Sequence, residues 1–315
     1  GGLVSSFIGA AVKAKVALIE KHKMGGDCLN TGCVPSKALI SSAKAVQMMK
    51  KHSLYGLKNV NYEVDFAQVM ERVQDIIAKI EPHDSVERFT SLGVECHIGE
   101  ATIRSPHEVE VNGKILTTKN IVVATGARPF IPPTPGLEDV SFSHSDNLWQ
   151  LRKQPKHLAV IGGGPIGSEL AQAFRRLGSE VTIFNMDRGI LPREDSDMVQ
   201  FICDSFNKDG INLLDEAQIT RIEKKSARLH AFIIPDTMKK SIWTLIIFWP
   251  QSDVFQTLPA LGWKIWVWNL TKTKLSKSTS IYVPASQTFT PAGMWQDRIN
   301  SLTWLDIRLG LPPST

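Results

Sequence analysis

Hydrophobic residues in the first 225 positions follow two alternating patterns. Short apolar runs, such as Val16–Ile19 followed by the acid Glu20, are typical of buried parallel strands. Between such runs, apolar residues recur at the spacing of amphipathic helices, one of them over about Val4–Ala14. Strands that alternate with helices predict an α/β fold built on parallel sheets.

The middle of this part combines a long predicted helix with several short strands. The helix is expected over Val64–Gly93, and strands are expected over Glu95–Ile103, over Glu108–Val111 and from Ile121–Pro129 into a glycine turn. The proline-rich stretch Pro129–Pro135 is typical of a linker. An apolar stripe on the long helix is expected to pack in the core: Phe66, Val69, Met70, Val73, Ile76, Ile77 and Ile80.

The ten residues C-L-N-T-G-C-V-P-S-K, from Cys28 to Lys37, contain the most specific chemical signal. Two cysteines lie five positions apart across a short loop that contains Gly32. Cys33 opens a predicted helix that has Pro35 in its first turn, where the missing N–H costs nothing. A helix N-terminus favours a thiolate, and a short loop can close a reducible disulfide. We therefore predict a redox-active pair.

Two other interpretations of the pair compete with this one. A zinc half-site would need a second Cys/His pair at ligand spacing, whereas Cys96 and Cys203 are isolated, so no metal site is expected. Two incidental buried thiols are the other alternative, because cysteine is common in protein cores.

A glycine-rich loop follows the apolar run His157–Ile161 and opens a helix that ends near residue 177. Gly162 allows the tight turn, Gly164 lets the backbone approach a pyrophosphate, and Gly167 lets helix and strand pack closely. The strand expected over Glu180–Phe184 completes a dinucleotide-binding unit. NAD-preferring sites place an acid after this strand. This chain has Asn185 there, so the choice between NADH and NADPH stays open, with these charged residues nearby: Asp187, Arg188 and Arg193.

The run Val16–Lys37, V-A-L-I-E-K-H-K-M-G-G-D-C-L-N-T-G-C-V-P-S-K, resembles the FAD-dependent pyridine nucleotide–disulfide oxidoreductases. The motif is most similar to those of the mercuric-reductase-like and dihydrolipoamide branches, and the resemblance covers about residues 1–225. It implies two Rossmann-like dinucleotide-binding domains, for FAD and NAD(P), in a three-layer α/β fold. It also implies that electrons pass from NAD(P)H through FAD to the Cys28–Cys33 disulfide and then to a substrate. In that scheme Cys33 faces the flavin, Cys28 attacks the substrate, and Lys37 lies near the flavin.

The resemblance assigns further cofactor contacts. Glu20 is expected to bind the adenosine ribose of FAD, although taken alone it is an ordinary solvated strand-end carboxylate. The remaining expected FAD contacts are Gly26, Lys37, Gly99, Ala101, Thr125, Gly126 and Ala127. The expected NAD(P) contacts are Gly162, Gly164, Pro165, Ile166, Gly167, Glu169 and Asn185. The opening residues Gly1-Gly2-Leu3 resemble the end of a G-x-G-P-G-G-L loop, so the first strand of the FAD domain is expected to be missing.

Composition changes abruptly near residue 225. Seven of the eight tryptophans lie beyond it, and no glutamate follows Glu223. We expect an FAD domain over residues 1–130, a linker over 131–150, a partial NAD(P) domain over 151–225 and an aberrant, irregular tail over 226–315. Nine lysines and arginines against four aspartates give this tail the +5 charge of the whole chain. The basic charge is therefore poor evidence for nucleic-acid binding by the folded part.

The genetic code suggests why the tail differs. Read one base upstream, the codons of Met294-Trp295-Gln296 specify Val-Ala, and the codons of Met294–Leu305 as a whole admit D-V-A-G-P-Y-Q-F-T-H-L-A, which resembles the second FAD motif of the family. The same shift across Ser252–Thr273 admits V-G-R-x-N-V-S-G-F-G-L-E-D-L-G-L-E-L-T-K. We infer that the encoding DNA is read out of frame from about residue 226. A genuine tryptophan-rich domain is the alternative.

The sequence leaves three functions open: a flavoprotein disulfide (or mercuric-type) oxidoreductase, an inactive frame-shifted fragment, and an NAD(P)-binding module without catalysis. The expected partner of the first is a small-molecule or small-protein disulfide, or a metal ion, and the parent family is homodimeric. No nucleic-acid or membrane partner is expected. One close cysteine pair among four cysteines, with no signal peptide or transmembrane segment, favours the cytoplasm.

Overall fold

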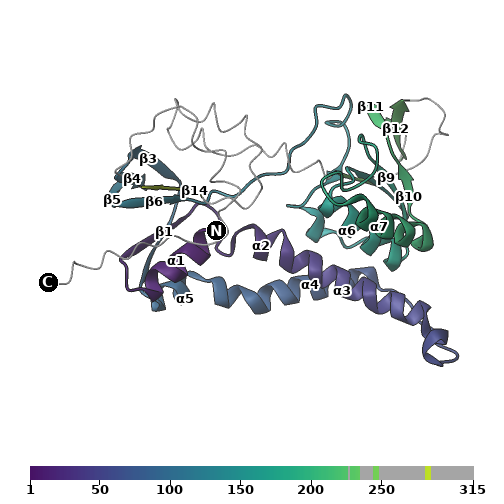
Figure 1. Ribbon diagram of the computed structural model, residues 1–315, viewed down its shortest axis with the longest axis horizontal. Coiled ribbons are helices and arrows are strands. Elements are labelled where there is room, and N and C mark those ends of the chain that lie inside the picture. The colour runs from purple at the N-terminus through teal and green to yellow at the C-terminus, as the bar shows by residue number, and fades with distance from the viewer. Residues whose placement is uncertain (226–227, 235–243, 248–280, 285–315) are drawn as a thin grey trace.

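The computed structural model describes residues 1–225, 228–234, 244–247 and 281–284, which form two α/β units. Figure 1 shows the first unit around β1 and β6 and the second around β9 and β10, with the long helices α3 and α4 beneath them. The parallel pairing of β1 with β2 and of β8 with β9 confirms the α/β class expected from the alternating strands and helices.

The first unit is built on a parallel pair of strands. β1 (Val16–Glu20) follows α1 (Gly2–Ala11) and pairs with β2 (Val94–Ile98). The chain between the two strands is helical and contains α2 (Gly26–Asn30), α3 (Cys33–Lys50), η1 (His52–Tyr55), α4 (Phe66–Ile80), η2 (Glu81–Asp84) and α5 (Val86–Ser91). Two antiparallel sheets complete the unit: β3 (Ala101–Ser105), β4 (Glu108–Val111) and β5 (Lys114–Thr117) form one, and β6 (Asn120–Val123) with β14 (Ile281–Pro284) forms the other.

Several expectations for the first unit were wrong in detail. The helix expected over Val64–Gly93 breaks after α4, because Pro82 cannot continue the helical hydrogen-bond ladder and the Ser85 hydroxyl caps a new helix, α5. The strand expected over Glu95–Ile103 divides into β2 and β3 at Gly99, whose φ is +158°. β1 is largely half-buried rather than buried, because β2 is its one strand partner among the described residues.

The second unit contains a five-stranded parallel sheet in the order β10-β9-β8-β13-β7. Its strands are β7 (Phe142–Ser143), β8 (His157–Ile161), β9 (Glu180–Phe184), β10 (Asn212–Leu214) and β13 (Thr244–Ile247). α6 (Pro165–Leu177) connects β8 to β9, and α7 (Ser196–Asp209) connects β9 to β10. β11 (Gln218–Lys225) pairs with β12 (Arg228–Ile234) in a separate antiparallel ribbon.

Three strands fall in the stretch expected to be an irregular tail. β12 and β13 join the second unit, and β14 pairs with β6 of the first. These three segments are regular strands within the stretch expected to be irregular, because their backbones pair with strands formed by the first 225 residues. The rest of the tail lies outside the described residues.

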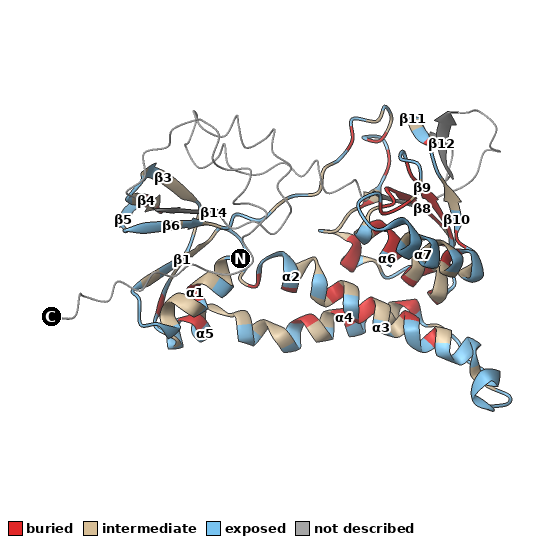
Figure 2. Ribbon diagram, viewed as in Figure 1, coloured by how far each residue is buried: buried red, intermediate tan, exposed pale blue. Residues whose placement is uncertain are grey.

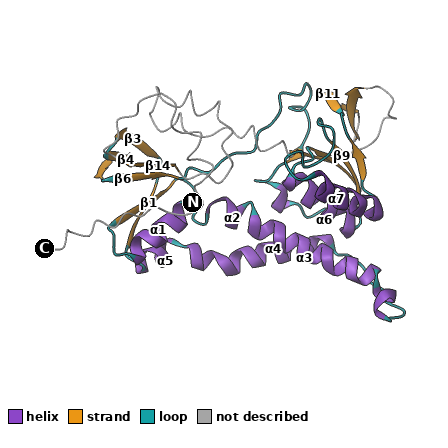
Figure 3. Ribbon diagram, viewed as in Figure 1, coloured by secondary structure: helices purple, strands orange, loops and turns teal. Residues whose placement is uncertain are grey.

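One hydrophobic core joins the two units (Figure 2). Leu39 of α3, Met70 of α4 and Phe174 of α6 are completely buried in it, and the Phe66 and Phe174 rings approach to 5.7 Å between centroids. The apolar stripe of α4 faces this core, as expected. Figure 3 shows α3 and α4 running side by side under the strands of both units. Their packing holds the start of α3 close to the start of α6.

Candidate active site

Gly32 allows the loop between the two cysteines to be tightly folded. Cys28 lies in α2, and Cys33 is the first residue of α3. Gly32 stands between the helices, where an added Cβ would lie 2.8 Å from the Asp27 carbonyl oxygen and 3.5 Å from the Cα of Cys28. Any side chain at this position would push α3 away from α2. Because Gly32 has no side chain, Cys33 can lie beside Cys28.

The two thiols lie close enough to affect each other's ionisation. Both cysteines are exposed and carry free thiols in this structure. Partial desolvation, the neighbouring Cys33 thiol and the negative charge of Asp84 raise the pKa of the Cys28 thiol. Two neighbouring thiols can become a disulfide by losing two electrons and two protons. The pair is therefore placed for the predicted redox chemistry, which itself stays a prediction.

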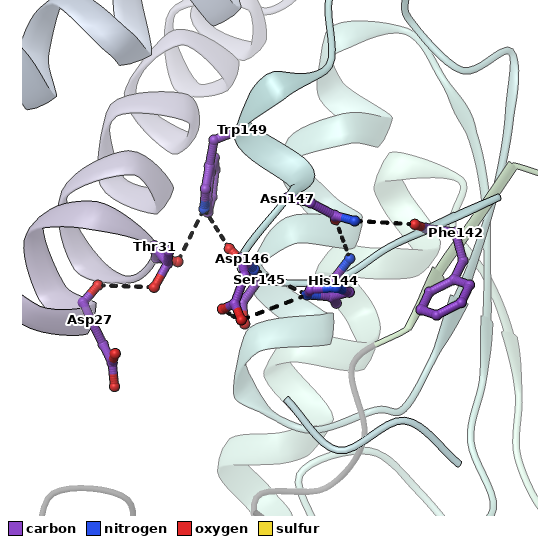
Figure 4. A network of polar contacts seen from close by, with 8 residues as sticks. All are labelled: Asp27, Thr31, Phe142, His144, Ser145, Asp146, Asn147 and Trp149. Atoms are coloured by element: carbon purple, nitrogen blue, oxygen red, sulfur yellow. Dashed lines mark hydrogen bonds and ion pairs between the residues drawn. The ribbon is translucent and has the colours of Figure 1, made fainter. Parts of the chain in front are cut away.

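Trp149 links this loop by hydrogen bonds to the segment that leads into the second unit (Figure 4). Its buried indole Nε1 donates to the Thr31 carbonyl oxygen at 3.1 Å and to the Ser145 carbonyl oxygen at 2.7 Å. The Thr31 backbone N–H donates in turn to the Asp27 carbonyl oxygen at 3.0 Å. Sequence reasoning missed Trp149, and the one signal for it was its position as the only tryptophan before the tail.

An ion pair links the redox helix to the glycine-loop helix. Lys37 Nζ, one turn into α3, lies 2.5 Å from Glu169 Oε2 in the first turns of α6. Both side chains are exposed, so the pair contributes little to stability. The pair is informative because of its position: Lys37, an expected FAD contact, lies beside Glu169, an expected NAD(P) contact.

The expected ribose contacts converge at the carboxyl ends of β1 and β2. Glu20 Oε1 accepts a hydrogen bond from the His22 backbone N–H at 2.8 Å, and the Gly99 N–H donates to the Glu20 carbonyl oxygen at 2.8 Å. A Cβ on Gly99 would lie 2.3 Å from Oδ1 of Asn112, so a side chain there would displace the Asn112 amide. Ala101 begins β3 directly afterwards. The second carboxylate oxygen of Glu20 accepts no hydrogen bond from the described residues and suits a ribose hydroxyl.

The remaining expected FAD contacts lie around α2. Gly26 begins α2 with a φ of +60°, and the turn Thr125–Ala127 follows β6. Gly126, at the centre of this turn, has a φ of +69°, and a Cβ on it would lie 3.3 Å from Asp27 Oδ2. The turn therefore sits against the redox loop. The residues expected to contact FAD thus lie at the Glu20 end and around α2, and their contact with FAD stays a prediction.

The glycine loop of the second unit has the backbone geometry expected from its spacing. Gly162 has a φ of +109°, which favours glycine. A Cβ on Gly167 would lie 2.1 Å from the Gly162 carbonyl oxygen, so the helix can approach the strand only without a side chain there. A Cβ on Gly164 would meet nothing within 4 Å, which leaves open space where a ligand would approach. Pro165 and Ile166 form the first turn of α6 beside it. Nucleotide binding itself stays a prediction.

The structure does not place the Asn185 side chain in position to contact a ribose. Asn185 is 3% exposed, and its amide nitrogen donates to the carbonyl oxygens of Asp187 and Gly189, both at 2.8 Å. Its side-chain oxygen accepts from the Gly163 N–H at 3.2 Å. The side chain therefore uses its hydrogen bonds to hold the glycine loop in place. Its neighbours Asp187 and Arg188 are exposed and could face a ligand instead.

No three His, Cys, Asp or Glu side chains of the described residues gather in a way that could hold a metal ion. In the same part of the chain, no helix has the length and apolar character needed to cross a membrane.

Known sequences match most of the described part. A family model described as pyridine nucleotide-disulphide oxidoreductase matches residues 1–249, beyond the limit near 225 expected for the resemblance. A mercuric reductase from Bacillus cereus is 37% identical over 225 residues, which cover 71% of this chain and 36% of that protein. A dihydrolipoyl dehydrogenase from Acholeplasma laidlawii is 35% identical over 229 residues, which cover 71% of this chain and 68% of that protein.

Solved structures show the same fold. The HOCl-induced flavoprotein disulfide reductase RclA from Escherichia coli superimposes with a TM-score of 0.65 and 26% identity, over 78% of this chain and 53% of that one. LpdA from Mycobacterium tuberculosis gives a TM-score of 0.70 at 23% identity, over 83% of this chain and 59% of that one. The chain thus spans between about half and three fifths of these structures, and 36% of the mercuric reductase.

Proposed function

Because the chain belongs to the pyridine nucleotide-disulphide oxidoreductase family, we propose that it is an NAD(P)H-dependent flavoprotein that reduces its substrate through Cys28 and Cys33. The observation that carries this proposal is the tight loop at Gly32, which keeps two exposed, free thiols close to each other. Conversion of the disulfide to two thiols consumes two electrons and two protons. NAD(P)H supplies a hydride, which carries both electrons and one proton, and solvent supplies the other proton.

The two cysteines have different proposed tasks. Cys33, the first residue of α3, would lie against the flavin. Cys28 would attack the substrate, and its raised pKa means that it must lose a proton to do so. FAD, when bound, supplies the electron transfer between nicotinamide and disulfide. Lys37 would lie near its ring system, oriented by Glu169.

The proposed coenzyme rests on the glycine loop, and the proposed substrate class rests on the similar proteins. Gly162, Gly164 and Gly167 would hold the pyrophosphate of NADH or NADPH at the N-terminus of α6. The substrate class we propose is a small-molecule or small-protein disulfide, or a metal ion, because the similar proteins include a mercuric reductase and a dihydrolipoyl dehydrogenase. We further propose a cytoplasmic protein whose parent form is a homodimer.

A second candidate is an NAD(P)-binding module without catalysis. It is favoured by the completeness of β8, the glycine loop, α6 and β9. On this alternative the protein purifies colourless and binds the coenzyme without reducing a disulfide.

One anaerobic titration separates the two. The oxidised chain, incubated with FAD, is titrated with NADH or NADPH while flavin absorbance and free thiols are followed. The proposal predicts flavin reduction and two additional thiols per chain. Cys28→Ser and Cys33→Ser should lose the additional thiols while their flavin is still reduced, and the control Cys96→Ser should keep both signals. Coenzyme binding by calorimetry without flavin reduction or new thiols would support the binding module instead.

A further inference from the structure

A basic hollow lies where three helices end, far from both candidate cofactor sites. The C-terminal ends of α3, α6 and α7 surround a space of about 290 Å³. Its lining residues are Gln47, Lys50, Arg175, Arg176, Lys208 and Asp209. Since a helix rises 1.5 Å per residue, the 13 residues of α6 place this hollow roughly 20 Å from the glycine loop.

The hollow holds more positive charge than its protein groups neutralise. Four cations face one carboxylate, Asp209, whose side chain is 5% exposed. Both of its oxygens are occupied: Gln47 donates to Oδ1 at 2.9 Å, and Gln172 and Arg176 donate to Oδ2 at 2.9 Å. Burial, together with the positive charges of Arg175 and Arg176, lowers the pKa of Lys50. The cations therefore repel one another without full compensation.

Helix capping accounts for part of this cluster. Lys50 Nζ donates to the Arg176 carbonyl oxygen at 3.1 Å, and Arg175 Nε donates to the Asp209 carbonyl oxygen at 2.8 Å, as cations at helix C-termini commonly do. Other donors stay unused: the ammonium group of Lys208 and the terminal nitrogens of Arg176 have no hydrogen-bond partner among the described residues. These donors border the same hollow.

We infer that this hollow binds a small oxyanion with two or more negative charges, of the phosphate or pyrophosphate class. Guanidinium groups suit the planar, paired acceptors of such ions, and an ammonium group adds a point charge. The volume admits a pyrophosphate group, either free or as part of a phosphate ester. A bound anion would join α3 of the first unit to α6 and α7 of the second. The inference does not depend on the proposed oxidoreductase activity.

The test is calorimetric titration of the full chain with phosphate and with pyrophosphate, at an ionic strength held constant with NaCl. Saturable binding is expected, tighter for pyrophosphate, and weakened at least tenfold in the double variant Lys50→Gln/Lys208→Gln. The matched control Lys44→Gln/Lys153→Gln removes two exposed lysines elsewhere and should change the affinity less than twofold. A phosphate monoester such as glycerol phosphate distinguishes an esterified ligand from the free ion.

Competition with NADH guards against binding at the glycine loop. Excess NADH should leave pyrophosphate binding unchanged, and the Lys50/Lys208 variant should bind NADH like the unsubstituted chain. The inference is overturned by absence of saturable binding, by equal weakening in the control pair, or by loss of pyrophosphate binding when NADH is added.

Discussion

Substitution by alanine should have different effects at two glycines of the nucleotide loop: it should lower stability at Gly167 and NADH affinity at Gly164. In Gly167→Ala, the new Cβ would lie 2.1 Å from the Gly162 carbonyl oxygen. Non-bonded heavy atoms pack at about 3.5 Å, so α6 must move from β8 by roughly 1.4 Å. Overpacking of this kind costs about 3 kcal/mol, which corresponds to a loss of about 6–12 °C in Tm for residues 1–225, whose two units share one core.

In Gly164→Ala the backbone is already acceptable to alanine, with a φ of −70°, and the new Cβ meets nothing within 4 Å. Stability should therefore stay within about 1 kcal/mol of the unsubstituted chain. The methyl group would instead occupy the space of the approaching pyrophosphate, and NADH affinity should fall at least tenfold, about 1.4 kcal/mol.

Thermal unfolding followed by circular dichroism and calorimetric titration with NADH give the two readouts on the same samples. Gly167→Ala should melt early, and Gly164→Ala should melt normally but bind poorly. If Gly164→Ala binds NADH unchanged, or if Gly167→Ala melts with the parent, the assigned roles of this loop are incorrect.

The redox loop allows two further predictions. Trp149→Phe keeps an aromatic ring but removes the indole hydrogen bonds to Thr31 and Ser145. The bond to Thr31 is worth about 0.5–1.5 kcal/mol, so the thiol–disulfide equilibrium against glutathione should shift about 2- to 13-fold toward the dithiol; an unchanged equilibrium would show that the indole does not position the loop. Asp84→Asn removes a negative charge that raises the pKa of Cys28, so more of that thiol is ionised near neutral pH. In a Cys33→Ser background, alkylation by iodoacetamide should then rise at lower pH than with Asp84 present, and coinciding pH profiles would argue against that contact.

The sequence predicted those elements whose signals are local. The strands expected over Glu108–Val111, His157–Ile161 and Glu180–Phe184 appear with those bounds as β4, β8 and β9, because each is a compact run closed by turn residues. The break of the long helix at Pro82 was missed, because the apolar stripe continued toward it and outweighed a single proline.

Contacts between distant residues could not be predicted in this way. Lys37 and Glu169 are 132 positions apart and meet only because α3 and α6 share one core. The bracing role of Asn185 depends on carbonyl groups that the loop presents after folding. Trp149 reaches Thr31 across 118 positions, and no motif marks that contact.

The central claim is that Cys28 and Cys33 form a redox couple, and disulfide mapping tests it most directly. The full chain is mildly oxidised, its remaining thiols are alkylated, and its peptides are analysed by mass spectrometry. We predict one intramolecular Cys28–Cys33 bond that dithiothreitol reverses, with Cys96 and Cys203 both alkylated. Alkylation of both Cys28 and Cys33 after oxidation, or a bond from either of them to Cys96, Cys203 or another chain, would contradict the account.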